Sequence, residues 1–295
     1  MYEECILCPR KCKVNRNKSV GFCGAGANLK VSKAMLHLWE EPPISGEKGS
    51  GAVFFSHCTL KCCFCQNYKI SSEGFGKEIS EKRLEEIFLN LAENGANNIN
   101  LVSATQYIPQ IIKVLDIVKP KINIPIVYNT SGYETVEIIK SLDGYVDIYL
   151  PDLKYKSSNL SEKYSGAKDY FECASKAILE MYRQVPKNIY TKDGLLKKGM
   201  IIRHMVMPNC TYDTKDILMW IKENLPLDDI LISIMSQYTP FYKSKNIDEI
   251  NRRLTEEEYN EVMDFALDIG IENGFMQELS SAKEEYTPNF DLEGV

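Results

Sequence analysis

Short apolar runs alternate with amphipathic stretches from residue 51 onward. Short runs rich in apolar residues are typical of strands covered on both faces, and apolar residues recurring every third or fourth position predict helices. The predicted strands cover 51–56, 98–103, 124–129, 146–150, 200–207 and 230–236, and 274–279 is a candidate for a last strand. The predicted helices lie between them, at 80–95, 108–118, 133–141, 168–183, 213–223 and 255–270.

This alternation predicts parallel βαβ units with right-handed connections. About six such units indicate an α/β fold, a partial TIM-type (β/α)6 barrel of parallel strands. We expect the barrel to occupy residues 51–295. Residues 1–50 are rich in Cys, Gly, Pro and Lys and show little periodicity, so we expect them to form a cysteine-rich N-terminal extension.

Polar residues follow each of the six predicted strands. Side chains at the C-terminal ends of barrel strands form the functional site in folds of this type. A polar cap at one end of an apolar barrel is hard to explain by packing alone, so these ends predict a site. The clusters read "SHC", "SATQY", "YNTSGY", "PDLKY", "PN" and "SQYTP" in chain order.

The cluster after the first strand contains Cys58, Cys62 and Cys65 in the spacing C-x3-C-x2-C. Thiolates are the soft ligands that iron–sulfur clusters require. Three cysteines leave one iron of a four-iron cluster open to a cofactor or substrate. A structural zinc site would need a fourth ligand. His57 and Cys63 are candidates, but each adjoins a proposed ligand in sequence, which would strain a tetrahedral cage.

Composition narrows the class of protein further. The chain has 35 basic and 41 acidic residues, a net charge of -6, which argues against a nucleic-acid or anionic-membrane surface. It has no run of 18 apolar residues, and its first residues lack the apolar core of a signal peptide. We therefore expect a cytoplasmic protein with no membrane span, in which clustered cysteines hold metal rather than form disulfides.

The motif C-x3-C-x-aromatic-C after the first strand of a βα repeat resembles that of the radical S-adenosylmethionine superfamily. Further stretches, among them "NINLVSATQYIPQI", "VDIYLPDLKY" and "IIRHMVMPN", resemble the larger proteins similar to pyruvate formate-lyase activating enzyme. The resemblance implies a [4Fe-4S] cluster that cleaves S-adenosylmethionine to a 5′-deoxyadenosyl radical. That radical would take hydrogen from a protein, such as a glycyl radical enzyme, or from a small molecule. A flavodoxin or ferredoxin would supply the electron.

The resemblance also assigns roles to individual residues. Cys58, Cys62 and Cys65 match the cluster ligands. Activating enzymes usually have Gly-Gly-Glu-Pro after the second strand to bind the methionine amine, and "SATQY" stands there in this chain. Ser103 and Thr105 are the candidates to replace it. In all, we predict cofactor contacts at Phe64, Ser103, Thr105, Asn129, His204 and Gln237, and catalytic roles for Asp152, Lys154 and Arg203.

A second cysteine set lies in the N-terminal extension, with the spacing C-x2-C-x3-C-x10-C. Four thiolates make a closed site, and a segment with so few apolar residues would need one to become ordered. Zinc and a second iron–sulfur cluster both fit four sulfurs, with a slight preference for zinc in a structural role. The predicted ligands are Cys5, Cys8, Cys12 and Cys23.

The sequence leaves two alternative functions open. A non-enzymatic zinc or iron–sulfur protein for electron transfer or interaction would explain both cysteine sets, but not the polar strand ends. A methyltransferase would need a glycine-rich loop after its first strand, which this chain lacks. We expect packing roles for Cys63, Cys173, Cys210 and His37, and we place Tyr107, Tyr128 and Tyr238 near the mouth of the barrel.

Overall fold

The computed structural model describes residues 2–276 and 288–295. Its centre is a ten-stranded sheet with the order β10-β9-β8-β6-β5-β4-β2-β1-β3, and β7 pairs with β8 outside this path. The neighbours from β2 to β10 in this order are parallel. This confirms the predicted α/β partial barrel. The parallel strands are β2 (Ser50–Phe55), β4 (Ile99–Val102), β5 (Ile126–Thr130), β6 (Ile148–Pro151), β8 (Leu196–Met205), β9 (Leu231–Met235) and β10 (Gly274–Met276).

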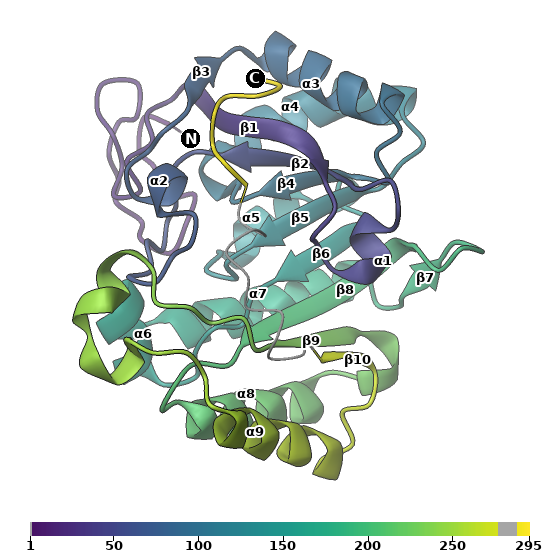
Figure 1. The fold of residues 1–295 in the computed structure, drawn as a ribbon. Helices are drawn as coiled ribbons and strands as arrows, with labels where there is room; N and C mark the ends of the chain where they lie inside the picture. Colours follow the sequence, from purple (N-terminus) through teal and green to yellow (C-terminus); the bar gives the residue numbers. More distant parts are fainter. Residues whose placement is uncertain (1, 277–287) are drawn as a thin grey trace.

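Helices cover the outer face of this sheet (Figure 1). In α3, the Ser80 side chain caps the N-terminus by accepting a hydrogen bond from Arg83 N, and Leu84, Phe88 and Leu91 are buried on one face. The larger apolar core lies between the sheet and these helices. The long helices are α3 (Glu81–Glu93), α4 (Ile108–Val118), α7 (Tyr170–Gln184), α8 (Thr211–Asn224) and α9 (Glu256–Asp268), and α5 (Val136–Ser141) and α6 (Ser158–Ser165) are shorter.

A second, smaller apolar cluster lies on the inner face of the sheet. Val127, Leu150 and Ile201 form a cluster there with Ile44 of the short helix α1 (Pro42–Ser45). Successive residues of a strand point to opposite faces, which explains how β5, β6 and β8 serve both cores. The N-terminal region therefore closes one end of the barrel interior with α1.

The N-terminal region also adds strands that the sequence analysis did not predict. β1 (Leu29–His37) runs antiparallel to β2, and β3 (Lys77–Ile79) runs antiparallel to β1. β1 thus joins the region predicted as an extension to the sheet of the barrel. The remaining short elements are α2 (Tyr68–Ser71) and β7 (Ile189–Tyr190).

The C-terminal residues 288–295 return to β1, in yellow in Figure 1. Ala34 N donates to Glu293 O at 2.9 Å, and Lys33 Nζ lies 3.0 Å from Asp291 Oδ1 and 2.8 Å from Glu293 Oε2. Of the last predicted strand, residues 274–276 form β10 and 277–279 lie outside the described residues. In the described part of the chain, none of the helices has the length and apolarity that crossing a membrane requires.

Candidate active site at the strand ends

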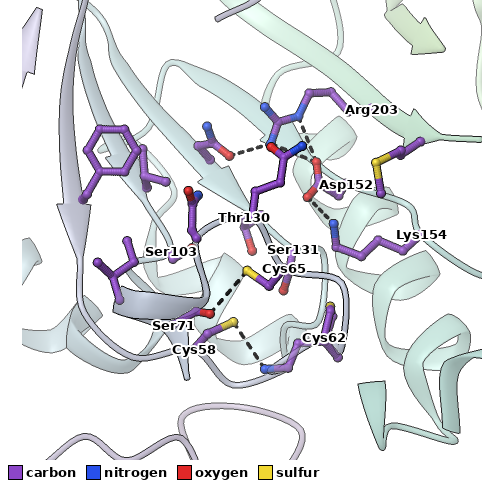
Figure 2. Close-up of a pocket in the computed structure, with 18 of the residues that line it drawn as sticks. Cys58, Cys62, Cys65, Ser71, Ser103, Thr130, Ser131, Asp152, Lys154 and Arg203 are labelled. Carbon is purple, nitrogen blue, oxygen red and sulfur yellow. Dashed lines mark hydrogen bonds and ion pairs between the residues drawn. The ribbon is translucent and has the colours of Figure 1, made fainter. Parts of the chain in front are cut away.

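A cavity of about 250 Å³ lies at the C-terminal ends of the parallel strands. Figure 2 shows the three thiols on one side of it and a group of charged side chains on the other. Each parallel strand from β2 to β9 contributes to the wall, directly or through the loop after it. Among the lining residues are Cys58, Cys62, Phe64, Cys65, Ser103, Asn129, Thr130, Asp152, Lys154, Arg203 and Gln237.

Cys58, Cys62 and Cys65 are held in the loop after β2. Leu60 N lies 3.4 Å from Cys58 Sγ, and Ser71 Oγ donates to Cys65 Sγ at 3.3 Å. Burial raises the pKa of the Cys62 thiol, and the nearby Lys154 ammonium opposes that rise. Burial also raises the pKa of Cys65 to about 12. Deprotonation at neutral pH would therefore need a strong positive partner such as iron.

These thiols fit an iron–sulfur cluster by donor type and number. Leu60 and Phe64, both buried, line the same cavity and supply apolar surroundings. Across residues 2–276 and 288–295, no three His, Cys, Asp or Glu side chains are arranged to hold a metal ion. A cluster makes a different demand from a single ion, because each thiolate binds its own iron.

The opposite wall is a network of charged and amide groups. Arg203 donates from Nε to Asp152 Oδ1 at 2.8 Å and from Nη2 to Asn129 Oδ1 at 2.7 Å. Lys154 Nζ donates to Asp152 Oδ2 at 2.7 Å. Burial alone would raise the pKa of Asp152, but Arg203 and Lys154 hold it below its ordinary value. Asp152 is therefore ionised at neutral pH and orients both cations.

Glu40 completes this network, although the sequence analysis missed it. Its Oε2 lies 3.3 Å from Arg203 Nη1, and its Oε1 accepts from Asn129 Nδ2 at 3.1 Å and from Asn100 Nδ2 at 3.2 Å. Glu40 comes from the turn between β1 and α1, in the region expected to be separate from the barrel. The sequence carries no local signal for this pairing, since the partners lie on β4, β5 and β8.

Two residues predicted to contact the cofactor, His204 and Thr105, are not among those that line the cavity. On β8, Arg203 and Met205 line the cavity, so the intervening His204 points to the opposite face. Its ring lies between Leu153 O, at 2.6 Å from Nδ1, and Thr214 Oγ1 of α8, at 2.8 Å from Nε2. Burial lowers the pKa of His204 to about 4, so the ring is a neutral structural group.

Thr105 is the second of these residues. It is buried and donates from Oγ1 to Glu134 Oε1 at 2.6 Å. Of the three tyrosines expected near the mouth, Tyr238 lines the cavity, whereas Tyr107 and Tyr128 are buried elsewhere. His37 lines the cavity and packs edge-on against Phe54, with ring centroids 6.0 Å apart.

The N-terminal cysteine set packs against the loop that carries the first set. Arg10 Nε donates to Thr59 O at 3.1 Å, and Lys61 Nζ lies 5.6 Å from the centre of the Phe22 ring. A Cβ on Gly24 would lie 2.8 Å from His57 Nδ1, so only glycine allows this close approach. The two cysteine-bearing segments are therefore in direct contact, on the side of the sheet where α2 lies (Figure 1).

Within this set, Cys5, Cys8 and Cys23 are buried and Cys12 is partly exposed. Burial raises the pKa of Cys8 to about 12 and also raises that of Cys23. The Sγ atoms of Cys12 and Cys23 lie 3.4 and 3.5 Å from the position that a Cβ on Gly21 would occupy. Four thiols in one short segment are of the donor type that zinc and iron bind, although among the described residues they are not arranged around a single metal ion.

A parallel α/β barrel with a three-cysteine loop and a charged wall at its strand ends defines a class of cluster-dependent enzymes. Comparison with known proteins gives the family. The profile of the radical SAM superfamily matches residues 52–195. The chain is also 34% identical over 278 residues to an uncharacterized protein of Methanocaldococcus jannaschii, covering 90% of this chain and 75% of that one. Residues 52–195 of the chain therefore belong to the radical SAM superfamily.

Solved structures similar to this chain include those of two named proteins. The crystal structure of methylornithine synthase is 13% identical, with a TM-score of 0.49, and the match covers 71% of this chain and 59% of that one. A domain of pyruvate-formate lyase-activating enzyme from Bacteroides vulgatus is 14% identical, with a TM-score of 0.43, covering 59% and 92%. Membership of the superfamily implies a [4Fe-4S] cluster and S-adenosylmethionine as cofactors, and a need for a reductant.

Proposed function

We propose that this chain is an enzyme that cleaves S-adenosylmethionine reductively in the cavity and transfers hydrogen from a bound substrate. The observation that carries the proposal is the placement of Cys58, Cys62 and Cys65 in one cavity with the Asp152 network. When bound, a [4Fe-4S] cluster would supply the electron that breaks the sulfonium and yields a 5′-deoxyadenosyl radical. The cofactor carries the difficult chemistry, and the protein positions it.

The residues of the chain have separate tasks in this proposal. Cys58, Cys62 and Cys65 would hold three irons. Arg203, Lys154 and Asn129 line the cavity, and Asp152 holds the two cations in place. These groups suit the carboxylate and hydroxyl groups of the cofactor.

The apolar part of the wall has a different task. Phe64, Met205 and Met235 line the cavity beside the polar groups. They would exclude water, which protects a reactive intermediate from side reactions.

The substrate class is a narrower proposal. The resemblance to activating enzymes favours a protein substrate such as a glycyl radical enzyme. The stretch "SATQY", in place of Gly-Gly-Glu-Pro, argues against assuming the same target. Ser103, at the start of this stretch, lines the cavity and adopts a left-handed backbone with φ of 57°, as its place at a sharp turn after β4 requires. A small-molecule substrate is the alternative.

The N-terminal cysteines would hold a second metal group. Cys5, Cys8, Cys12 and Cys23 offer four thiols, the donor type and number of both a zinc site and a second iron–sulfur cluster. Because the described side chains are not arranged around a single ion, zinc binding would require them to move together. Direct contact with the first cysteine loop supports either a structural role or electron relay. Anomalous scattering at the zinc and iron absorption edges would decide between these metals.

The test of the proposed function is anaerobic incubation of the reconstituted protein with S-adenosylmethionine and dithionite. We expect 5′-deoxyadenosine to form. In the Cys58→Ala variant none should form, whereas the matched Cys173→Ala variant, altered at a partly exposed helix cysteine, should keep the wild-type rate. No 5′-deoxyadenosine from wild-type protein carrying a full complement of iron would refute the proposal.

A further inference from the structure

The N-terminal segment is positively charged in a negatively charged chain. Residues 1–30 contain six basic and two acidic residues, a net charge of +4, whereas the whole chain carries -6. A local field of this kind attracts partners of opposite charge and speeds their association. The segment therefore differs electrostatically from the rest of the molecule.

Most of these positive charges are not neutralised within the protein. In residues 2–276 and 288–295, Lys11, Lys18 and Lys61 have no carboxylate within ion-pair distance, and Lys13 pairs with Glu4 at 3.6 Å. Arg10 donates to backbone carbonyls, including Thr59 O at 3.1 Å, and likewise makes no ion pair in this part of the chain. Lys11 and Lys18 are exposed. The segment thus presents free positive charge to solvent.

Exposed apolar side chains accompany these charges. Ile6, Val20 and Phe22 of the same segment are 53%, 57% and 50% exposed. The Arg10 guanidinium lies 4.2 Å from the centre of the Phe22 ring, and Lys61 Nζ lies 5.6 Å from it. Protein interfaces are typically enriched in aromatic residues and arginine, with a polar rim. We call Arg10, Lys11, Lys18, Phe22 and Lys61 the N-terminal basic surface.

This surface adjoins the loop that holds the predicted cluster ligands. Arg10 contacts Thr59, next to Cys58, and Lys61, next to Cys62, lies against Phe22. A protein bound here would sit beside the backbone that carries the three thiols. None of the residues of this surface lines the cavity, so a protein docked here would not occupy the cavity wall.

We propose that the N-terminal basic surface docks a small acidic electron-carrier protein. The inference rests on the proposed function, which needs a reductant. On each encounter the carrier loses one electron, the group held by Cys58, Cys62 and Cys65 gains it, and no atom is transferred. Free positive charge on a segment that also exposes an aromatic ring complements an acidic surface. That complementarity, close to the cysteine loop, favours an electron carrier over a substrate protein or a second copy of this chain.

The test compares two double charge reversals in the full-length reconstituted protein. Lys11→Glu with Lys18→Glu alters the basic surface. Lys192→Glu with Lys197→Glu is the matched control, since both lysines are exposed and adjoin β7, away from the N-terminal segment in Figure 1. The probes are a flavodoxin and a plant-type ferredoxin, and their Kd is measured by calorimetry at low and at moderate salt.

We expect the first variant to bind at least one carrier about tenfold more weakly than wild type, and the control to bind within about twofold. Added salt should weaken wild-type binding. Phe22→Ala should also weaken it, which gives a variant with unchanged charge. The rate with dithionite, a small reductant that needs no docking, should stay at the wild-type value in Lys11→Glu with Lys18→Glu.

Several results would overturn the inference. Equal binding of the carriers by both double variants would do so, and so would the absence of carrier binding by the wild type. The inference would also fail if Lys11→Glu with Lys18→Glu lost self-association or substrate binding in place of carrier binding. Failure of the proposed function would look different, because wild type would then form no 5′-deoxyadenosine even with dithionite.

Discussion

Asp152 is the residue on which the charged wall depends. It pairs with Arg203 at 2.8 Å and with Lys154 at 2.7 Å, and these side chains are 15–18% exposed. Removing one partner of a largely buried ion pair leaves the other charges uncompensated. We expect Asp152→Asn to lower the free energy of unfolding by about 3 kcal/mol, measured by urea denaturation.

A surface pair provides the control for this prediction. Lys82 is 69% exposed and pairs with Glu85 at 3.1 Å. Lys82→Ala should therefore lower the free energy of unfolding by less than about 1 kcal/mol. If Asp152→Asn lowered the free energy of unfolding as little as Lys82→Ala does, the charged wall would be solvated rather than preorganised.

Glu134 gives a prediction about pH. Its Oε1 accepts hydrogen bonds from Thr105, Tyr128 and Thr130, and its Oε2 has no partner in the described residues. Burial raises the pKa of Glu134 from 4.5 to about 7, although these hydroxyls oppose the rise. The unfolded chain therefore releases this proton at lower pH than the folded protein does, and stability falls as pH rises from about 4.5 to about 7.

Over that interval the contribution of Glu134 amounts to roughly 3 kcal/mol, since one pKa unit corresponds to about 1.4 kcal/mol. In Glu134→Gln, the fall in the free energy of unfolding between pH 4.5 and pH 7 should shrink by about that amount, measured by urea denaturation at both pH values. An identical pH dependence in both proteins would mean that the carboxyl is ionised in the fold.

At the scale of elements, β8 serves two layers through its alternation. Arg203 faces the cavity and His204 faces α8. We expect Arg203→Leu to weaken S-adenosylmethionine binding about tenfold or more, because a positive charge that lines the cavity is lost. His204→Leu should leave binding within about twofold but cost about 1–3 kcal/mol of stability, because Leu153 O and Thr214 Oγ1 lose their partner.

Calorimetric titration and urea denaturation of both variants would check this pair of predictions. If His204→Leu abolished binding while stability stayed unchanged, the orientation of β8 described above would be wrong.

The sequence predicted the elements that carry a local signal. Helix 108–118 was predicted with the bounds of α4, and Ser80 was predicted to open the helix that it caps in the structure. β1 was missed because its buried Lys33 interrupts the apolar pattern. That lysine is stabilised by Asp291 and Glu293, more than 250 residues away in sequence, so no local pattern could reveal it.

In the site, as in the fold, features with a local sequence signal were predicted, and those that depend on distant segments were not. The cysteine spacing and the polar strand ends predicted the three cysteines of the cavity and many of its polar residues, among them Asn129, Asp152 and Lys154. Glu40 could not be predicted, because it reaches Arg203 only once β1 and α1 are folded onto the barrel. His204 was assigned to the wrong face because the residues alone do not fix which way a strand covered on both sides is turned.

The arrangement of the whole molecule leads to its central claim. Among the described residues, three thiols line a cavity large enough to admit a small ligand, and a charged wall faces them. A metal site with four protein ligands would have a structural role. Three cysteine ligands leave one iron of a four-iron cluster free to bind a cofactor. The fold thus brings the three-cysteine loop together with polar groups from distant strands.

Electron paramagnetic resonance of the reduced, reconstituted protein tests this claim most directly. The four N-terminal cysteines would be replaced by alanine so that any second cluster is silent; if that protein does not fold, wild type with the N-terminal signal subtracted serves instead. The account predicts a [4Fe-4S] signal that changes when S-adenosylmethionine is added and that is lost in Cys62→Ala. A cluster signal that S-adenosylmethionine leaves unchanged, or zinc bound at these three cysteines, would contradict it.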